Sequence, residues 1–434
     1  MGHTSAKDIY HQLGKKIDGL ITHAPWNQTL FEILKELYTL QEAEVLVRMS
    51  YSLSTFEQVA TATKFDRLEL QRILDGLCEK GLVFDILLND KYYYIQAPMV
   101  VGIFEMTMMR TKGELKYAEW AKLFHAYLND SDDFYAANFK HGEKVSPMRV
   151  VPHEEAIDDN SYVEILDYEK ARTIIENTSK FSIGLCSCRH EKLHLGEKTC
   201  NVPLETCSSF GPGADLMIRH GFAREASKSE MLENVARSKE MGLVLTADNV
   251  QKEVGFMCHC CGCCCNLLLG VSKHGYPNSV VTSTFIAEVY EENCSGCEKC
   301  STACPVDAIS MKVAGEPNSG KRKLAKVDKN ICLGCGVCAL SCSKKAIKLV
   351  KRTQRVLHPE NTFQRVILAS LEKGTLQNQI FSEPQNISHK FLRGFVGGFL
   401  RIPLVKQSLM NDQLRSRFLS TTESAARKKG LSGV

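Results

Sequence analysis

One spacing of cysteines occurs twice in the chain and restricts its possible folds more than any other feature. Both copies have the form C-x2-C-x2-C-x3-C, and they involve Cys294, Cys297, Cys300 and Cys304, then Cys332, Cys335, Cys338 and Cys342. A buried cysteine that only fills space behaves as a small apolar residue and needs no fixed spacing. The repeat therefore indicates sulfur atoms that are held at set positions as ligands.

The number of cysteines and their expected environment support ligation over cross-linking. The chain has 434 residues and 19 cysteines, so it can bury a large core without disulfide staples. Residues 1–20 lack the apolar stretch of a secretory signal, and no uncharged apolar run reaches the length of a spanning helix. We therefore expect a cytoplasmic protein, in which disulfides do not persist and cysteines serve metal binding or redox chemistry.

The two copies resemble the motifs of a bacterial-type ferredoxin with two [4Fe–4S] clusters, over residues 282–350. The resemblance implies that three cysteines of each copy bind one cluster, while the fourth binds the other cluster. On this pattern one cluster is held by Cys294, Cys297, Cys300 and Cys342, and the other by Cys332, Cys335, Cys338 and Cys304. A zinc ribbon would use Cys-x2-Cys pairs instead, so we do not expect one here.

Some residues around the motifs follow the ferredoxin pattern and others depart from it. Ala308-Ile309 and Ala346-Ile347 match the apolar positions that begin two pseudo-symmetric strands. Ser343 stands where the family usually has proline, and the insert Met311–Asn330 is long and basic. Neither departure removes a ligand.

A second group of cysteines lies in the middle of the chain, within residues 181–281. Its members are Cys186, Cys188, Cys200, Cys207, Cys258, Cys260, Cys261, Cys263, Cys264 and Cys265. Side chains of adjacent residues diverge, so one metal cannot use all of the closely spaced ones. We expect at least one further metal centre here, either a third iron–sulfur cluster or zinc, and the spacing does not choose between them. A redox-active thiol pair and inert buried cysteines are the alternatives.

A histidine motif lies in the same region. His190-Glu191-Lys192-Leu193-His194 has the H-E-x-x-H form of zinc proteases, which requires a helix that places both histidines on one face. We predict no long apolar helix around it and assign no protease activity. No catalytic residue is assigned.

Residues 1–100 resemble a winged-helix domain, with helices expected before a hairpin at Asn89-Asp90. Ser54 to Glu57 and Asp66 to Glu69 have the form of helix caps, and Leu68, Ile73, Leu74 and Leu77 form the predicted buried stripe. The region is net acidic, with 10 Lys+Arg against 13 Asp+Glu. A recognition helix needs basic and amide side chains, so we expect packing or dimerisation here and no nucleic-acid binding.

The remaining segments are a connector and a basic tail. Residues 101–180 are predicted to be a helical linker, with 129–161 as a polar arm. Residues 351–434 form a helical tail with 14 Lys+Arg against 5 Asp+Glu. Within Lys390–Arg401 the side chains Phe391, Phe395 and Phe399 fall in one row of an amphipathic helix. Such a helix lies on an anionic membrane, docks on a partner or packs on its own chain.

Taken together, the sequence predicts an α+β multidomain protein. Its parts are a winged-helix-like domain (1–100), a connector (101–180), a Cys-rich α/β metal-binding unit (181–281), a two-cluster ferredoxin-like module (282–350) and the tail (351–434). The expected function is single-electron transfer with a redox partner protein, through two [4Fe–4S] clusters to or from the middle centre. The alternatives are a self-contained iron–sulfur reductase, which would be an oxidoreductase, and a redox-sensing winged-helix regulator. A homodimer and peripheral membrane contact are the other partners considered.

Overall fold

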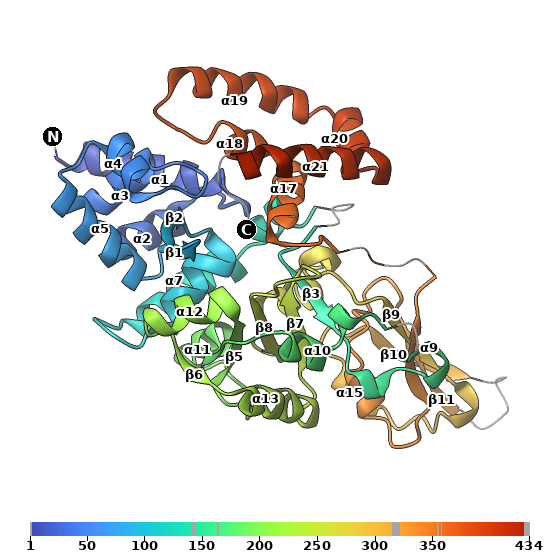
Figure 1. Ribbon diagram of the computed structural model, residues 1–434. Coiled ribbons are helices and arrows are strands. Elements are labelled where there is room, and N and C mark those ends of the chain that lie inside the picture. The colour runs from blue at the N-terminus through green and yellow to red at the C-terminus, as the bar shows by residue number, and fades with distance from the viewer. Residues whose placement is uncertain are drawn as a thin grey trace. The chain divides into compact units, whose positions relative to one another are not determined.

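The computed structural model describes residues 2–140, 145–162, 165–314, 322–353, 356 and 358–428 (Figure 1). The chain forms two compact units. Unit 1 contains residues 1–138, 219–222 and 360–434, and unit 2 contains residues 139–218 and 223–359. The predicted division into five segments is finer than this and stays a prediction. Helices and several small sheets occur together, as expected for an α+β chain.

Unit 1 begins with helices and a hairpin. These are α1 (Gly2–Asp18), α2 (Gln28–Leu37), α3 (Leu40–Arg48), α4 (Phe56–Thr63), α5 (Arg67–Glu79), β1 (Val83–Leu88) and β2 (Lys91–Gln96). The predicted hairpin turn is confirmed, because Asn89 and Asp90 adopt φ angles of 49° and 60° between paired strands. Asp66 caps α5 as predicted, since its side chain accepts from the N–H groups of Leu68 and Glu69.

Two details of this region differ from the prediction. The cap of α4 is one residue later than expected: Thr55 is the N-cap and Gln58 completes the capping box. Leu68 is 72% exposed, although it was expected in the buried stripe of α5. Leu70, Leu74 and Leu77 form that stripe, because positions four and three apart share one face of a helix.

The basic tail is helical and packs within unit 1. The unit continues with α6 (Phe104–Met109), α7 (Tyr117–Asn129) and α8 (Asp133–Asn138), and ends with α17 (Thr362–Lys373), α18 (Leu376–Ile380), α19 (Ile387–Leu400), α20 (Pro403–Met410) and α21 (Asp412–Lys428). The Asn378 side chain donates to the carbonyl of Gly19 at 2.8 Å, and the Tyr51 N–H donates to that of Ser382 at 2.9 Å. The two ends of the chain therefore form one unit.

Unit 2 is built on a six-stranded sheet. Its strands, in spatial order, are β3 (Met148–Val151), β7 (Val244–Asp248), β8 (Phe256–Cys260), β5 (Glu205–Phe210), β4 (Phe181–Leu185) and β6 (Ala223–Ala226). Every neighbouring pair is antiparallel. The middle unit is therefore α+β, and its predicted α/β description is wrong. The polar arm predicted over 129–161 is also wrong at Met148–Val151, which is a fully buried edge strand.

The two faces of this sheet carry different chemistry. One face is apolar and packs against α10 (Ala171–Glu176) and α13 (Lys228–Glu240), with Phe181, Leu245 and Met257 in the shared core. Successive side chains of a strand alternate between faces. Since Met257 faces the core, Cys258 and Cys260 of β8 point to the opposite face, where no comparable apolar layer is needed.

The ferredoxin-like module lies in the same unit. Its elements are β9 (Phe285–Val289), α15 (Lys299–Ala303), β10 (Ile309–Ala314), β11 (Arg322–Val327), α16 (Val337–Leu340) and β12 (Ile347–Lys351). Two strands begin at Ile309 and Ile347, as predicted. The long insert contributes the end of β10 and β11, which pair as a hairpin, while its residues 315–321 lie outside the described ones.

Replacing Ser227 tests the cap that sets the start of α13. Ser227 and Glu230 have the S-x-x-E spacing from which the sequence predicts a capping box. Ser227 is the N-cap, its Oγ accepts from the Glu230 N–H at 3.2 Å, and Glu230 completes the box. Ser227→Ala should destabilise α13 by about 1 kcal/mol, which faster amide hydrogen exchange along α13 would reveal. Ser227→Asp keeps an acceptor and should exchange like the parent; equal acceleration in both variants would contradict this role.

Candidate metal centres

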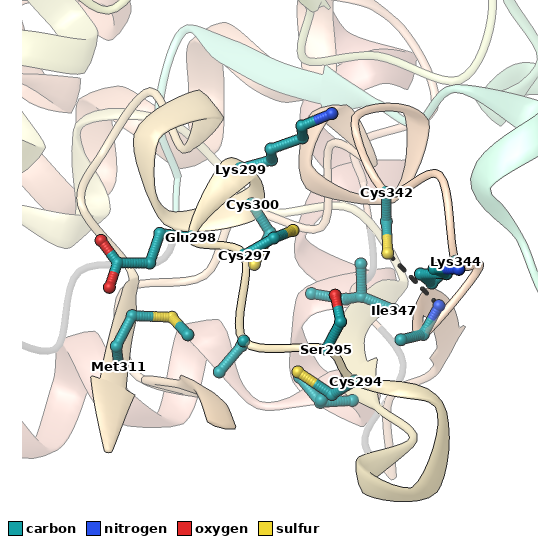
Figure 2. A pocket seen from close by; sticks show the side chains of 14 residues that line it. Cys294, Ser295, Cys297, Glu298, Lys299, Cys300, Met311, Cys342, Lys344 and Ile347 are labelled. Atoms are coloured by element: carbon teal, nitrogen blue, oxygen red, sulfur yellow. Dashed lines mark hydrogen bonds between the residues drawn. The ribbon is translucent and has the colours of Figure 1, made fainter. Parts of the chain in front are cut away.

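The first site is a pocket that brings together cysteines from both copies of the repeat. Cys294, Cys297, Cys300 and Cys342 line it, and their sulfur atoms lie around one shared space (Figure 2). The first three come from the loop before α15 and from α15 itself, whereas Cys342 follows α16. The apolar side chains of the pocket are Val289, Met311, Ala325, Ala346 and Ile347.

The second site repeats this arrangement with the roles of the copies exchanged. Cys332, Cys335 and Cys338 line a pocket together with Cys304 from the first copy. The equivalence extends to hydrogen bonds, since the Ala308 N–H donates to Cys304 Sγ at 3.2 Å and the Ala346 N–H donates to Cys342 Sγ at 3.3 Å. The structure thus brings together both sets of four cysteines that the sequence predicted.

Glycines allow the backbone to pass close to these pockets. Gly334 adopts a φ of 71°, and a Cβ there would overlap the carbonyl oxygen of Phe285. Gly296, with a φ of 70°, approaches the backbone of Lys323 in the same way. Both loops therefore require glycine for conformation and for space.

The two pockets differ in their access to solvent. Cys297 is exposed, and the backbone N–H of Lys299 lowers the pKa of its thiol. Cys332, Cys335 and Cys338 are all at most 8% exposed, and burial raises the pKa of Cys335 to about 12. Of the two sets of sulfurs, the first is therefore the more accessible from solvent.

Four of the ten middle cysteines form a compact third group. The sulfur atoms of Cys200, Cys261, Cys263 and Cys264 all lie within 4.8 Å of one another. The Cys200 sulfur is 3.7 Å from that of Cys261 and 4.0 Å from that of Cys264, and 3.6 Å separates the sulfurs of Cys263 and Cys264. We call these four residues the tetrathiol group. Val202 and Leu243 pack against it.

The tetrathiol group adjoins the second pocket through backbone contacts. A Cβ on Gly262 would lie 2.8 Å from the carbonyl oxygen of Pro305, which lines that pocket. His153 makes a second link, because its N–H donates to the Cys335 carbonyl at 3.0 Å and its Nε2 lies 2.8 Å from the Leu243 carbonyl. The middle unit and the module are therefore packed directly together at their cysteines.

A buried arginine lies beside the middle cysteines. Arg189 is fully buried, and its guanidinium donates to the Pro203 carbonyl at 3.0 Å, to Thr206 Oγ1 at 2.5 Å and to the His259 carbonyl. In the part of the chain that the structure describes, no carboxylate forms an ion pair with it. A buried cation requires a countercharge, and thiolates are the anions within reach.

The pKa values of the neighbouring groups agree with this countercharge. Although burial opposes the effect, the sulfurs of Cys186 and Cys261 raise the pKa of Arg189. A hydrogen bond from Cys264, together with the Arg189 guanidinium, lowers the pKa of Cys261 to about 4. Cys261 is therefore a thiolate at neutral pH, which is the form that binds metal.

The other six middle cysteines lie on strands and at helix starts. The sequence predicts them on loops on either side of the helix that Ser227 caps, and this prediction is wrong. Cys207 is in β5, Cys258 and Cys260 are in β8, Cys186 precedes and Cys188 lies in α11 (Ser187–His194), and Cys265 precedes α14 (Asn266–Ser272). No signal in the sequence separated these six from the tetrathiol group, because the division depends on strand pairing.

The histidine motif lies on a short polar helix, in agreement with the prediction that no long apolar helix carries it. Helix α11 carries it, and the Nε2 atoms of His190 and His194 are 3.0 Å apart. Glu191 is fully buried and accepts from the Asn266 side chain at 2.7 Å. Because Glu191 is engaged in this contact, its role is to join α11 to α14.

Comparisons with known proteins assign one segment of the chain to a family. Residues 293–352 match the family model described as a 4Fe-4S dicluster domain, so this segment is of ferredoxin type. Neither the curated proteins nor the solved structures yielded a match. Over the described residues, no helix combines the length and apolar character needed to cross a membrane.

Proposed function

We propose that this protein transfers single electrons through two [4Fe–4S] clusters held by the two cysteine pockets. The exchange of Cys304 and Cys342 between the copies carries this proposal. Clusters bound there would supply one-electron redox chemistry. The backbone N–H groups of Ala308 and Ala346 would stabilise the ligating thiolates, since donors to sulfur tune the charge that a cluster bears.

The difference in exposure between the two sets of cysteines suggests a route for the electrons. The first pocket, with exposed Cys297, is the contact point for a redox partner protein. The second pocket has buried Cys332, Cys335 and Cys338, and it adjoins the tetrathiol group at Gly262 and Pro305. Electrons would therefore pass from the partner through the first site and the second site toward the middle unit, or in reverse.

The tetrathiol group fits a single metal ion. Zn–S bonds of about 2.3 Å in a tetrahedron place the sulfurs about 3.8 Å apart. The sulfur separations of 3.6, 3.7 and 4.0 Å agree with that value. A [4Fe–4S] cube carries each thiolate on a different iron and would hold them further apart. Zinc would make the site structural, whereas a single iron would let it carry electrons.

The winged-helix interpretation of residues 1–100 gains one structural observation. Ser54, just before α4, forms an isolated antiparallel bridge with Tyr94 of β2, so the chain before α4 lies beside the hairpin. The recognition helix of a winged-helix domain would correspond to α5. Its first residue, Arg67, donates to the two carboxylate oxygens of Glu57, with N–O distances of 2.7 and 2.5 Å. We therefore propose a packing role for this region, and a redox-sensing regulator is the weaker alternative.

Cys342→Ser tests the exchange of ligands between the copies. If Cys342 serves the first site, the variant should perturb the same cluster signal in EPR as Cys294→Ser, with about four irons lost per chain. Cys335→Ser should perturb the other signal. Cys78→Ala is the control, because Cys78 is buried in α5 within unit 1. If Cys342→Ser altered the same signal as Cys335→Ser, each copy would bind its own cluster.

Cys263→Ser tests the single-ion site. Cys263 is partly exposed and contacts Cys264, so its loss should weaken or release one metal ion per chain while the module keeps about eight irons. Elemental analysis of the anaerobically purified chain should show one zinc, or one iron with a tetrathiolate spectrum. Loss of about four irons with Cys263→Ser would mean that the group holds a cluster instead.

A further inference from the structure

We propose that the six remaining middle cysteines form a second centre in the middle unit, separate from the tetrathiol group, and that it binds an iron–sulfur cluster. We call Cys186, Cys188, Cys207, Cys258, Cys260 and Cys265 the hexathiol group. The proposal rests on the proposed electron-transfer function, because this cluster would accept electrons from the two clusters of the module or donate electrons to them. With it, Cys78 is the one cysteine of the 19 outside a site.

Strand pairing places three of these sulfurs on one face of the sheet. Ser208 of β5 pairs with Met257 of β8, so the next residues, Cys207 and Cys258, face each other across the strands. Gly184 of β4 pairs with Cys207 and has no side chain to fill the space. Cys260 lies two residues beyond Cys258 and therefore points to the same face, where Thr246 Oγ1 is 3.2 Å from its sulfur.

Two helix starts bring the other three sulfurs to this face. Cys186 is the N-cap of α11 and Cys188 lies in its first turn, while Cys265 is the N-cap of α14. The hydrogen bond from Asn266 to Glu191 holds these two helices together.

Neighbouring thiols of this group interact in pairs. Cys258 interacts with Cys207 and Cys260, and Cys265 interacts with Cys260 and Cys188. Cys186 lies close enough to Cys188 and Cys207 for their charges to interact. These pairs link the sulfurs on the strands to those at the helix starts.

The neighbouring tetrathiol group stays separate although the two groups share one loop. Cys260 and Cys261 are consecutive in the chain, and so are Cys264 and Cys265, yet each pair is divided between the groups. The buried guanidinium of Arg189 interacts with Cys186 and Cys260 of the hexathiol group and with Cys261 of the tetrathiol group. It therefore supplies positive charge to both groups at once.

The spread of the sulfurs favours a cluster over a single ion. Among the described residues, the tetrathiol group is the one set of three or more potential ligands whose atoms all lie within 4.8 Å of one another, so the six sulfurs are too widely spread for one tetrahedral ion. A [4Fe–4S] cluster takes four thiolates, each on a different iron, and therefore suits ligands that lie further apart. Each iron–thiolate bond that forms would release the proton of one thiol, and Arg189 would offset part of the resulting negative charge.

The test is the metal content of the full chain and of a double variant, Cys207→Ser with Cys258→Ser, both purified anaerobically. We expect the variant to lose about four irons with matching sulfide, while the EPR signals of the module and the metal of the tetrathiol group remain. Cys78→Ala should keep the parent content. Unchanged iron, or loss of the tetrathiol metal together with the cluster, would overturn the proposal.

Mössbauer spectra of the parent chain give a second measurement in case the double variant does not fold. Iron in excess of the module's two clusters and of one single ion supports the hexathiol centre, and no such excess overturns it. Absence of the module's own signals would instead contradict the proposed electron-transfer function.

A different observation points to an interaction surface on the tail. Ile387, Phe391, Phe395 and Phe399 follow at four-residue steps along α19 and are 85%, 72%, 72% and 55% exposed. Leu404 of α20 is 75% exposed as well. This result goes against packing of the phenylalanine row onto the chain itself, which was one of the expected alternatives.

We infer that this apolar ridge lies on the surface of an anionic membrane. Residues 387–410 contain no acidic side chain, and their basic residues are Lys390, Arg393, Arg401 and Lys406. Aromatic side chains flanked by cations match the boundary between acyl chains and anionic headgroups. A protein partner of mixed charge would find no acidic group here to pair with.

Vesicle co-sedimentation of the full chain tests this surface. Binding should require phosphatidylserine in phosphatidylcholine vesicles, weaken with added salt, and be lost when Phe391, Phe395 and Phe399 are all changed to serine. Leu68→Ser, at an equally exposed apolar position of α5, should bind like the parent. No binding by the parent, or a self-associated parent that the triple variant turns into a monomer, would overturn the inference.

Discussion

The exchange of one cysteine between the two halves of the module is the constraint on which the arrangement of sites depends. Cys304 and Cys342 each line the pocket of the other copy. If the two copies separated, each pocket would therefore lose one of its four cysteines. The same exchange places Pro305, directly after Cys304, against Gly262 in the cysteine loop of the middle unit. The module and the middle sulfurs are thereby held in one body of unit 2.

Charge balance explains why the middle unit keeps an arginine in its interior. Burying a guanidinium is unfavourable without an anion nearby, and Cys261, whose pKa is lowered to about 4, supplies one beside Arg189. A neutral thiol at that position would leave the cation without compensation. The arginine therefore supports the proposal that the tetrathiol group binds a metal ion.

Local sequence signals predicted elements well wherever the chemistry is short-range. The hairpin at Asn89-Asp90, the caps at Asp66 and Ser227, and the starts of β10 and β12 all follow from neighbouring residues. The misplaced cap at Thr55 and the exposed Leu68 show the limit of such signals. In both places a shift of one or two residues changes the face of a helix, and only tertiary packing selects that face.

The sequence by itself determined the cofactor chemistry of the module, because the repeated cysteine spacing is a local property of the chain. It also indicated at least one further metal centre among the ten middle cysteines, but it did not divide them. Only the tertiary structure separated four sulfurs from six and placed Arg189 beside both groups. The physical reason is that this division depends on the pairing of β5 with β8 and on the meeting of two helix starts, which are contacts between residues distant in sequence.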